Sequence, residues 1–400
     1  MSSLSQHDRP PETSTLVPLA DRVRSLEAGR AGLLMDMLRH RPDGIGLGRG
    51  DPDLPTPAHI VAAGRDALAK GLTKYTALRG IPELRRAVAD KLRRDNGIEA
   101  DPETEIVITT GTQEAVFVAL CALLNPGDEI VMADPYYNSY ATMLHYLGAT
   151  LVGVPTSPSD GFQIDPAEFQ KRITPRTKAI VLLTPNNPTG TVYPRDRLEA
   201  LASVAADAGV YLISDELYET IIFDGAPFSV ASMPELRDRT ITINGFSKAY
   251  SMTGWRVGYI AGPREVVEAL VTLRHTLTIC APSISQYAAV AALTGPQECL
   301  AERREIFRRR RDFAMARLTD AGIPFVRPGG TFYIFVDIRP SRLSSEDFAF
   351  ALMEREGVFV YPGAYFGAEG EGFERISMVV PEPVLQDAVD RMARVFRKPR

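Results

Sequence analysis

The chain has 400 residues, of which 45% are hydrophobic and 24% charged, and its formal net charge is −5. These values are ordinary for a globular protein, and the length favours two domains, or a large domain with a smaller one. Acidic and basic residues are interleaved, which excludes the basic surface typical of a nucleic-acid-binding protein. The basic run "RREIFRRRRD" (Arg303–Asp312) has apolar residues at helical spacing, so we expect a solvated helix face there.

Targeting and metal-binding signals are missing from the sequence. No apolar run reaches the length of a membrane span. Residues 1–15 are polar, without the hydrophobic region of a signal peptide, so we expect a disordered lead-in and a cytoplasmic protein. The three cysteines lack CxxC spacing and the five histidines are scattered, so the sequence predicts neither disulfides nor a metal site.

In chain order, residues 16–60 have no clear place in a sheet, and we expect them to pack on the C-terminal part of the protein. Short β-branched runs then alternate with helical stretches, and the helices end at glycine or proline breakers. These runs are residues 105–109, 128–133, 149–155, 178–184, 210–215 and 240–244. This alternation predicts an α/β domain, over residues 61–295, with a mostly parallel sheet flanked by helices on both faces.

The pattern changes in residues 296–400. A long charged helix precedes the strand-like run "PGGTFYIFVDI" (Pro328–Ile338), and further short strands and helices follow. This order predicts a smaller α+β domain with an antiparallel sheet, which the N-terminal segment would complete.

Polar residues follow several of the predicted strands. Ligands of open α/β sheets bind at the carboxyl ends of strands, so chemistry is expected there. Thr110-Gly111-Thr112-Gln113 opens a helix whose free N–H groups could hold an anion. A capped turn is the alternative interpretation. The turn "TPNNPTG" (Thr184–Gly190) could direct an amide toward a ligand, although such residues are common in any turn.

Charged residues follow three other strand-like runs. A carboxylate at Asp215, after an apolar strand, needs a partner such as a protonated ring nitrogen. Lys248 lies among small and aromatic residues, where lost solvation lowers its pKa and makes it a nucleophile. Arg256 suits a phosphate, and Arg375 in "FERIS" suits a carboxylate ligand or lies on an edge strand. A nucleophilic lysine, a carboxylate, an amide, the phenol of Tyr218 and a phosphate site together indicate pyridoxal 5′-phosphate.

The sequence resembles the class I (aspartate-aminotransferase-like) aminotransferases, which are fold-type I pyridoxal-phosphate enzymes. The resemblance covers nearly the whole chain, from "GIGLGRGDPDLPTP" (Gly44–Pro57) and "YTALRGIPELRRAVA" (Tyr75–Ala89) to "FERIS". The motifs "TPNNPTG", "SDELY", "SKAYSMTGWRVGY" and "RIS" occur in the family's order. The resemblance implies a large cofactor-binding domain, a small domain formed by both terminal segments, and a homodimer with an active site shared across its interface.

The resemblance also implies roles for individual residues. The implied catalytic residues are Lys248, which would bind the cofactor as a Schiff base, Asp215 at the pyridine nitrogen, and Tyr218. Asn187 and Tyr218 would bond the ring hydroxyl, and Tyr137 would stack on the ring. The implied phosphate ligands are Gly111, Thr112, Gln113, Arg256 and, from the neighbouring subunit, Tyr75. Substrate binding is implied for Arg375, Asn187 and the backbone near Gly50.

One position departs from the family pattern. Many relatives have a phosphate-binding serine three residues before the lysine, where this chain has Gly245. Ser247, next to the lysine, is not assigned to the phosphate site.

The resemblance implies a ping-pong transamination from an α-amino acid to a 2-oxo acid such as 2-oxoglutarate. The expected donor is aspartate-like or aromatic, and Arg30 and Arg49 mildly favour acidic substrates. A lyase or synthase, catalysing β-elimination or cyclopropane formation, is the alternative on the same scaffold. A cofactor-sensing regulator is disfavoured because only roughly forty residues precede Gly44, too few for a DNA-binding domain.

Overall fold

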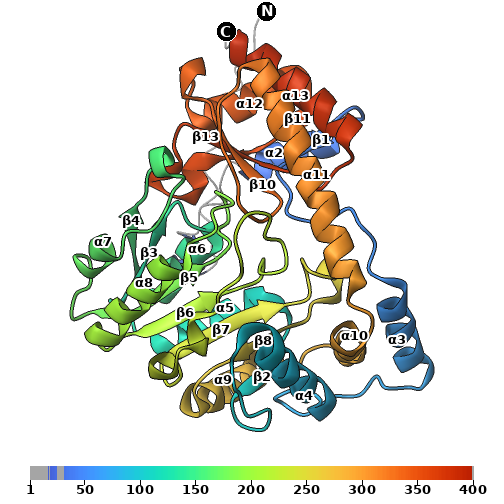
Figure 1. Cartoon of the computed structure of the whole chain (residues 1–400), viewed down its shortest axis with the longest axis vertical. Coiled ribbons are helices and arrows are strands. Elements are labelled where there is room, and N and C mark those ends of the chain that lie inside the picture. Colours follow the sequence, from blue (N-terminus) through green and yellow to red (C-terminus); the bar gives the residue numbers. More distant parts are fainter. Residues whose placement is uncertain (1–16, 18, 25–30, 399–400) are drawn as a thin grey trace, which may run out of the picture.

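The computed structural model describes residue 17, residues 19–24 and residues 31–398. The expected disordered lead-in, residues 1–15, lies outside these residues, and so does Arg30. Figure 1 shows the large sheet and its helices in the lower part of the view and a smaller α+β part above them, with the long helix α11 (Glu298–Ala321) extending from one to the other. In the described part of the chain, no helix is both long enough and apolar enough to cross a membrane.

The large sheet has seven strands in the order β2-β8-β7-β6-β5-β3-β4. In that order the strands are Ile106–Thr109, Gly258–Ala261, Thr240–Gly245, Tyr211–Asp215, Thr177–Leu183, Glu129–Asp134 and Thr150–Pro155. Every neighbouring pair is parallel except the two that involve β8, which runs antiparallel to β2 and to β7. The predicted mostly parallel sheet is therefore confirmed.

Helices cover both faces of this sheet because its strands are apolar on both sides. One face packs on α5 (Gly111–Leu123), α6 (Asn138–Leu147) and α9 (Arg264–Leu277). The opposite face packs on α4 (Pro82–Lys91), α7 (Pro166–Gln170), α8 (Arg195–Ala208) and α10 (Ser283–Thr294). A π-helical turn, Leu92–Asn96, continues α4, and α3 (Ala58–Ala69) packs against α10.

The smaller part contains the predicted antiparallel sheet, in the order β12-β13-β10-β9. These strands are Tyr361–Pro362, Phe373–Ser377, Tyr333–Asp337 and Phe325–Val326. Helices α11, α12 (Ser345–Glu356) and α13 (Glu382–Arg397) pack on it. The N-terminal segment contributes α1 (Asp21–Arg24), α2 (Ala31–Arg39) and β1 (Ile45–Gly46), and β1 pairs with β11 (Val358–Phe359).

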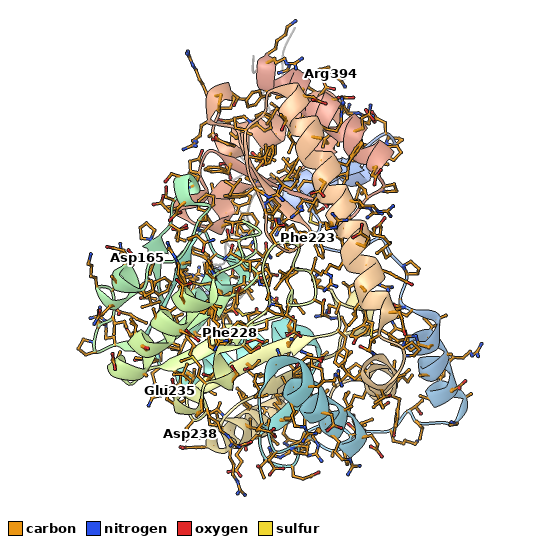
Figure 2. The ribbon with its side chains drawn as sticks, viewed as in Figure 1. Asp165, Phe223, Phe228, Glu235, Asp238 and Arg394 are labelled. Carbon is orange, nitrogen blue, oxygen red and sulfur yellow. The ribbon has the colours of Figure 1, made fainter. Side chains whose placement is uncertain are left out.

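Helix α11 differs from its prediction. We expected its basic run to be a solvated face, which is wrong for three arginines. The buried ones are Arg303, Arg310 and Arg311. Arg310 donates to both carboxylate oxygens of Asp53, at 2.7 and 2.8 Å. Arg311 lies 4.7 Å from the ring centre of Phe223, a residue that Figure 2 shows beside this helix. Helical spacing alone did not reveal that other segments cover this face.

Candidate active site

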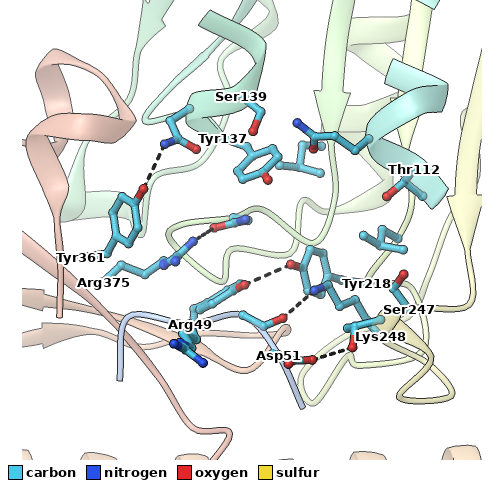
Figure 3. A pocket seen from close by; sticks show the side chains of 18 of the residues that line it. Arg49, Asp51, Thr112, Tyr137, Ser139, Tyr218, Ser247, Lys248, Tyr361 and Arg375 are labelled. Carbon is cyan, nitrogen blue, oxygen red and sulfur yellow. Dashed lines mark hydrogen bonds between the residues drawn. The ribbon is translucent and has the colours of Figure 1, made fainter. Parts of the chain in front are cut away.

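A cavity of about 600 Å³ lies where the carboxyl ends of the central strands meet the small domain. Figure 3 shows its side chains, which come from both domains and from the N-terminal segment. Ten of the residues singled out in the sequence line it: Gly50, Thr112, Gln113, Tyr137, Asn187, Asp215, Tyr218, Lys248, Arg256 and Arg375. The fold thus brings together the ends of strands that are far apart in the sequence.

Lys248 follows β7 and is buried beside the N-terminal segment. Its Nζ donates a hydrogen bond to the carbonyl oxygen of Gly50 at 2.5 Å. Burial lowers the pKa of Lys248 to about 8; the Asp51 carboxylate opposes this shift, and the Arg375 and Arg256 guanidinium groups add to it. A large fraction of the amine is therefore unprotonated in mildly alkaline solution, as a nucleophile or a general base requires.

Asp215 ends β6 and forms no ion pair with any residue that the structure describes. Its Oδ1 accepts a hydrogen bond from the backbone N–H of Leu217 at 3.3 Å. Its Oδ2 accepts one from the hydroxyl of Tyr140 at 3.2 Å. Burial raises the pKa of Asp215 to about 6, and the two hydrogen bonds oppose that shift. A buried carboxylate held in this way would be stabilised by a cationic ligand.

Sequence reasoning missed Tyr140. Its only signal was the tyrosine-rich run "PYYNSY" (Pro135–Tyr140), which opens α6. The side chain is fully buried, and its hydroxyl faces Asp215. The ring of Tyr137 lies nearly perpendicular to that of Tyr140, with 6.5 Å between the ring centres.

Arg375, on β13 of the small domain, reaches the cavity from the side opposite Lys248 (Figure 3). One of its terminal nitrogens donates to Asn187 Oδ1 at 2.8 Å, and the other donates to the carbonyl of Gly48 at 2.7 Å. Its Nε is buried and has no hydrogen-bond partner among the residues that the structure describes. The guanidinium group lies 4.3 Å from the ring centre of Tyr333 and 5.0 Å from that of Tyr361. It is therefore oriented rigidly and keeps a free donor for an anion.

Two polar groups remain available on the large-domain side. The Oδ1 of Asn187 accepts a hydrogen bond from Arg375, so the amide nitrogen of Asn187 is directed toward other acceptors. The hydroxyl of Tyr218 lies 3.2 Å from that of Tyr333, and either can be the donor. Burial raises the pKa of Tyr218 well above its usual value, so this phenol stays protonated.

The N-terminus of α5 forms one end of the cavity, and its free N–H groups suit an anion. Gly111 has φ +75°, and a Cβ there would lie 2.8 Å from a terminal nitrogen of Arg256. Gly111 thus lets the guanidinium group approach the free N–H groups of the helix. Arg256 itself has φ +54° and donates to the carbonyl of Thr253 at 3.0 Å. Thr112 adds a hydroxyl to the same end.

Ser247 also lines the cavity, beside Lys248 (Figure 3), although sequence reasoning left it unassigned. Gly245, at the position where the resemblance implies a serine in many relatives, does not line it. A Cβ on Gly245 would lie 3.0 Å from Thr112 Cγ2 and 3.2 Å from Gly258 Cα. The glycine therefore lets β7 approach the start of α5 closely. In the loop after β7, Ser247 supplies a hydroxyl that lines the cavity.

Two of the predicted residues, Gly111 and Tyr75, do not line the cavity. Gly111 supports the anion-binding end from behind Arg256. Tyr75 is 79% exposed in the single chain and does not line the cavity. Arg49 lines the cavity, and it forms no ion pair with any other described residue. Within residues 17, 19–24 and 31–398, no three His, Cys, Asp or Glu side chains are placed to hold a metal ion.

These groups could together hold a flat heteroaromatic phosphate that carries a carbonyl. The helix N-terminus and Arg256 suit its phosphate, and Asp215 suits a protonated ring nitrogen. Asn187 and Tyr218 suit a ring oxygen, while Lys248 suits the carbonyl carbon. Arg375 remains free for the carboxylate of a second molecule.

Comparisons with known proteins agree with this arrangement. The model of the family "Aminotransferase class I and II" matches residues 42–392. The chain is 42% identical to a probable aspartate/prephenate aminotransferase of Thermus aquaticus, over 99% of this chain and 100% of the other. It is 39% identical to aromatic-amino-acid aminotransferase 2 of Thermococcus litoralis, over 95% and 98% of the two chains. It is also similar to the structure of Thermus thermophilus aspartate aminotransferase with maleate, with a TM-score of 0.90 and 41% identity over 95% and 100% of the chains.

Proposed function

The chain belongs to the family of class I and II aminotransferases and is an aminotransferase, and on this premise we propose that it binds pyridoxal 5′-phosphate in the cavity beside Lys248. We propose further that it moves the amino group of an acidic or aromatic amino acid to a 2-oxo acid, with 2-oxoglutarate the first to test. The aminotransferase names of the relatives give no support to the lyase or synthase alternative.

The observation that carries this proposal is the pairing of Asp215 and Lys248 at one cavity. Asp215 is a buried carboxylate without a cation, which a pyridinium nitrogen would supply. Lys248 is an amine whose pKa burial lowers to about 8, so it can bind an aldehyde. Bound between them, the cofactor would supply a sink for the electron pair left when a substrate Cα loses its proton.

The residues of the chain would divide the remaining work. Arg375 binds the α-carboxylate through its free Nε, which aligns the substrate Cα–H bond. Lys248 Nζ would accept the proton from the substrate Cα and would later donate it to the aldehyde carbon of the cofactor. Asn187 and Tyr218 hold the ring oxygen, and Arg256, Thr112 and Ser247 hold the phosphate.

The residues that line the cavity suit both acidic and aromatic amino donors. Met35, Phe359 and Tyr361 give it an apolar side that suits an aromatic ring. Arg49 gives it a cation without an ion-pair partner among the described residues, which suits a second carboxylate. The names of the relatives include both aspartate and aromatic amino acids, in agreement with a dual pocket.

A homodimer and a cytoplasmic location belong to the same proposal. Tyr75 is too exposed to act in its own chain, but it could reach the phosphate of a neighbouring subunit. Replacement of Tyr75 by Phe should then weaken cofactor binding in the dimer, and sedimentation should show two chains per particle. A monomer with full activity would contradict this part.

The function is tested by a panel of amino donors with 2-oxoglutarate. Aspartate, glutamate, phenylalanine, tyrosine and alanine are mixed separately with the holoenzyme, and the cofactor absorbance is followed through a single half-reaction. We expect acidic and aromatic donors to react at least tenfold faster than alanine. Formation of ammonia and pyruvate instead of a 2-oxo acid and aminated cofactor would overturn the proposal. Equal rates for all five donors would overturn the dual pocket.

A further inference from the structure

A second cavity, of about 330 Å³, lies behind the segment that carries the catalytic lysine. Residues of one short segment alternate between the two cavities. Ser247 and Lys248 line the active-site cavity, whereas Gly245, Phe246, Ala249 and Tyr250 line the second one. A molecule in the second cavity would therefore contact the reverse side of the segment that positions Lys248.

The walls of the second cavity are aromatic and contain an unused donor. Phe246, Tyr250 and Tyr259 contribute rings, and Leu293 and Leu300 contribute aliphatic surface. Tyr259 is only 2% exposed, yet its hydroxyl forms no hydrogen bond with any residue that the structure describes. Tyr259 lines the cavity, so its hydroxyl can donate a hydrogen bond to a ligand acceptor there.

One of the cations around the second cavity has no acidic partner among the described residues. Lys91 forms an ion pair with Glu219, and Arg94 forms one with Asp95 at 2.8 Å. Arg304, on the first turns of α11, lines the cavity and forms no ion pair or hydrogen bond with the rest of the described chain. A guanidinium group at the mouth of an aromatic cavity suits the carboxylate of an aromatic acid.

The buried side of the cavity is joined by hydrogen bonds to the end of β7, which precedes the Lys248 segment. Asn244, the residue before Gly245, donates to Glu219 Oε1 at 2.7 Å and accepts from the N–H of Gly245 at 2.7 Å. Lys91 bonds Asn96 at 2.6 Å as well as Glu219. The end of β7 is thus held by the same network that borders the cavity.

We propose that this cavity binds a small aromatic carboxylate, with its ring between Phe246, Tyr250 and Leu300 and its carboxylate on Arg304, and that its occupancy changes turnover through the Lys248 segment. A volume of about 330 Å³ admits one aromatic ring with a short side chain and excludes larger ligands. The effect on turnover rests on the proposed aminotransferase activity, whereas binding does not.

The binding test uses 3-phenylpropanoate as the probe and the cofactor-loaded Arg375→Ala variant. That substitution removes the arginine that would hold an α-carboxylate in the active site, and the Leu300 variants below separate any remaining binding there from binding in the second cavity. By titration calorimetry, we expect one molecule per chain. Adding Leu300→Trp should fill the cavity and abolish binding, whereas Leu300→Met, which keeps the volume, should preserve it.

A charge variant tests how the ligand is held. Arg304→Gln should weaken binding at least tenfold, whereas Arg309→Gln, on the same helix but away from the cavity, should not change it. The alcohol 3-phenylpropanol should bind at least tenfold more weakly than the acid. No binding to Arg375→Ala, or binding that Leu300→Trp leaves intact, would overturn the site.

Turnover is measured in the holoenzyme with Arg375 intact. The probe should change kcat at saturating amino donor, and Leu300→Trp should remove that change while retaining activity. If the probe only competes with the amino donor, and does so equally in the native holoenzyme and in Leu300→Trp, the regulatory part is wrong. Because binding is measured in a variant that need not turn over, failure of this site and failure of the proposed function give different results.

Discussion

Asn187 and Arg375 are joined across the active-site cavity by a hydrogen bond of 2.8 Å, although one lies in the large domain and the other in the small domain. The bond fixes the guanidinium group and occupies the amide oxygen, so that each residue has one direction left for a ligand. Groups held in this way lose little freedom when a substrate binds. The pair therefore connects recognition of the substrate carboxylate with recognition of a ring oxygen.

Replacing Arg375 by Gln should lower kcat/KM for the amino donor by roughly ten- to a hundredfold. Loss of a hydrogen bond to a charged group costs about 1.5–3 kcal/mol, which sets that range. Single half-reactions followed by cofactor absorbance measure the change. Arg309→Gln is the matched control and should behave like the native enzyme. A loss confined to protein stability, with unchanged kcat/KM, would contradict the assigned role.

Replacing Tyr140 by Phe should raise the pKa of Asp215 further, because the tyrosine hydroxyl stabilises the carboxylate. A hydrogen bond worth about 1 kcal/mol predicts roughly fivefold weaker cofactor binding. Cofactor release during dialysis and the pH dependence of the cofactor spectrum measure both effects. Tyr211→Phe, which alters a tyrosine outside the cavity, is the control. An unchanged spectrum at every pH would exclude the contact from cofactor tuning.

The apoprotein should capture pyridoxal phosphate faster as the pH rises toward 8. Burial lowers the pKa of Lys248 to about 8, and only the unprotonated amine attacks the aldehyde. Below that pH, the rate should rise about tenfold per pH unit and then level off above it. In Asp51→Asn the profile should move to lower pH, because the Asp51 carboxylate raises the pKa of Lys248. A plateau only above pH 10 would refute the lowered pKa.

Replacing Glu374 by Gln should stabilise the fold in alkaline solution. Both side-chain oxygens of Glu374 are buried without a partner, and burial raises its pKa well above the usual value. The folded state thus holds a proton that the unfolded state releases, so stability falls as the pH rises above about 4.5, by up to about 1.4 kcal/mol per unit. Urea unfolding at pH 5 and pH 8 measures the difference. Glu265→Gln, at an exposed position, should keep the native pH dependence.

Replacing Gly245 by Ser should not improve the phosphate site, even though it restores the residue found in many relatives. Its Cβ would press on Thr112 and Gly258 at 3.0 and 3.2 Å. We expect a modest loss of stability, about 1–3 kcal/mol, and weaker cofactor binding. Ser247→Ala should also weaken binding, since its hydroxyl lines the cavity. Tighter binding in Gly245→Ser would show that the loop has room to adjust.

The sequence predicted the large sheet and part of the cavity, because β-branched strands and turn residues are local signals, whereas Tyr137 and Gly50 were implied by the family resemblance. Lys248, Asp215 and Asn187 each follow a strand, and the carboxyl ends of parallel strands share one edge of a sheet, so their proximity could be predicted. Tyr140 could not be found in this way, since its partner is remote in sequence and only packing directs its hydroxyl. The buried arginines of α11 were misread for the same reason. Their covering residues, Asp53 among them, lie in distant segments.

The bond between Arg310 and Asp53 has a mechanical consequence for the reacting amine. Asp53 lies three residues after Gly50, whose carbonyl accepts the hydrogen bond from Lys248. Helix α11 therefore holds the piece of chain that touches the lysine, while its other end is built into the small domain. Any displacement of α11 would therefore be passed through Asp53 to Gly50, and so to the hydrogen-bond acceptor of the amine.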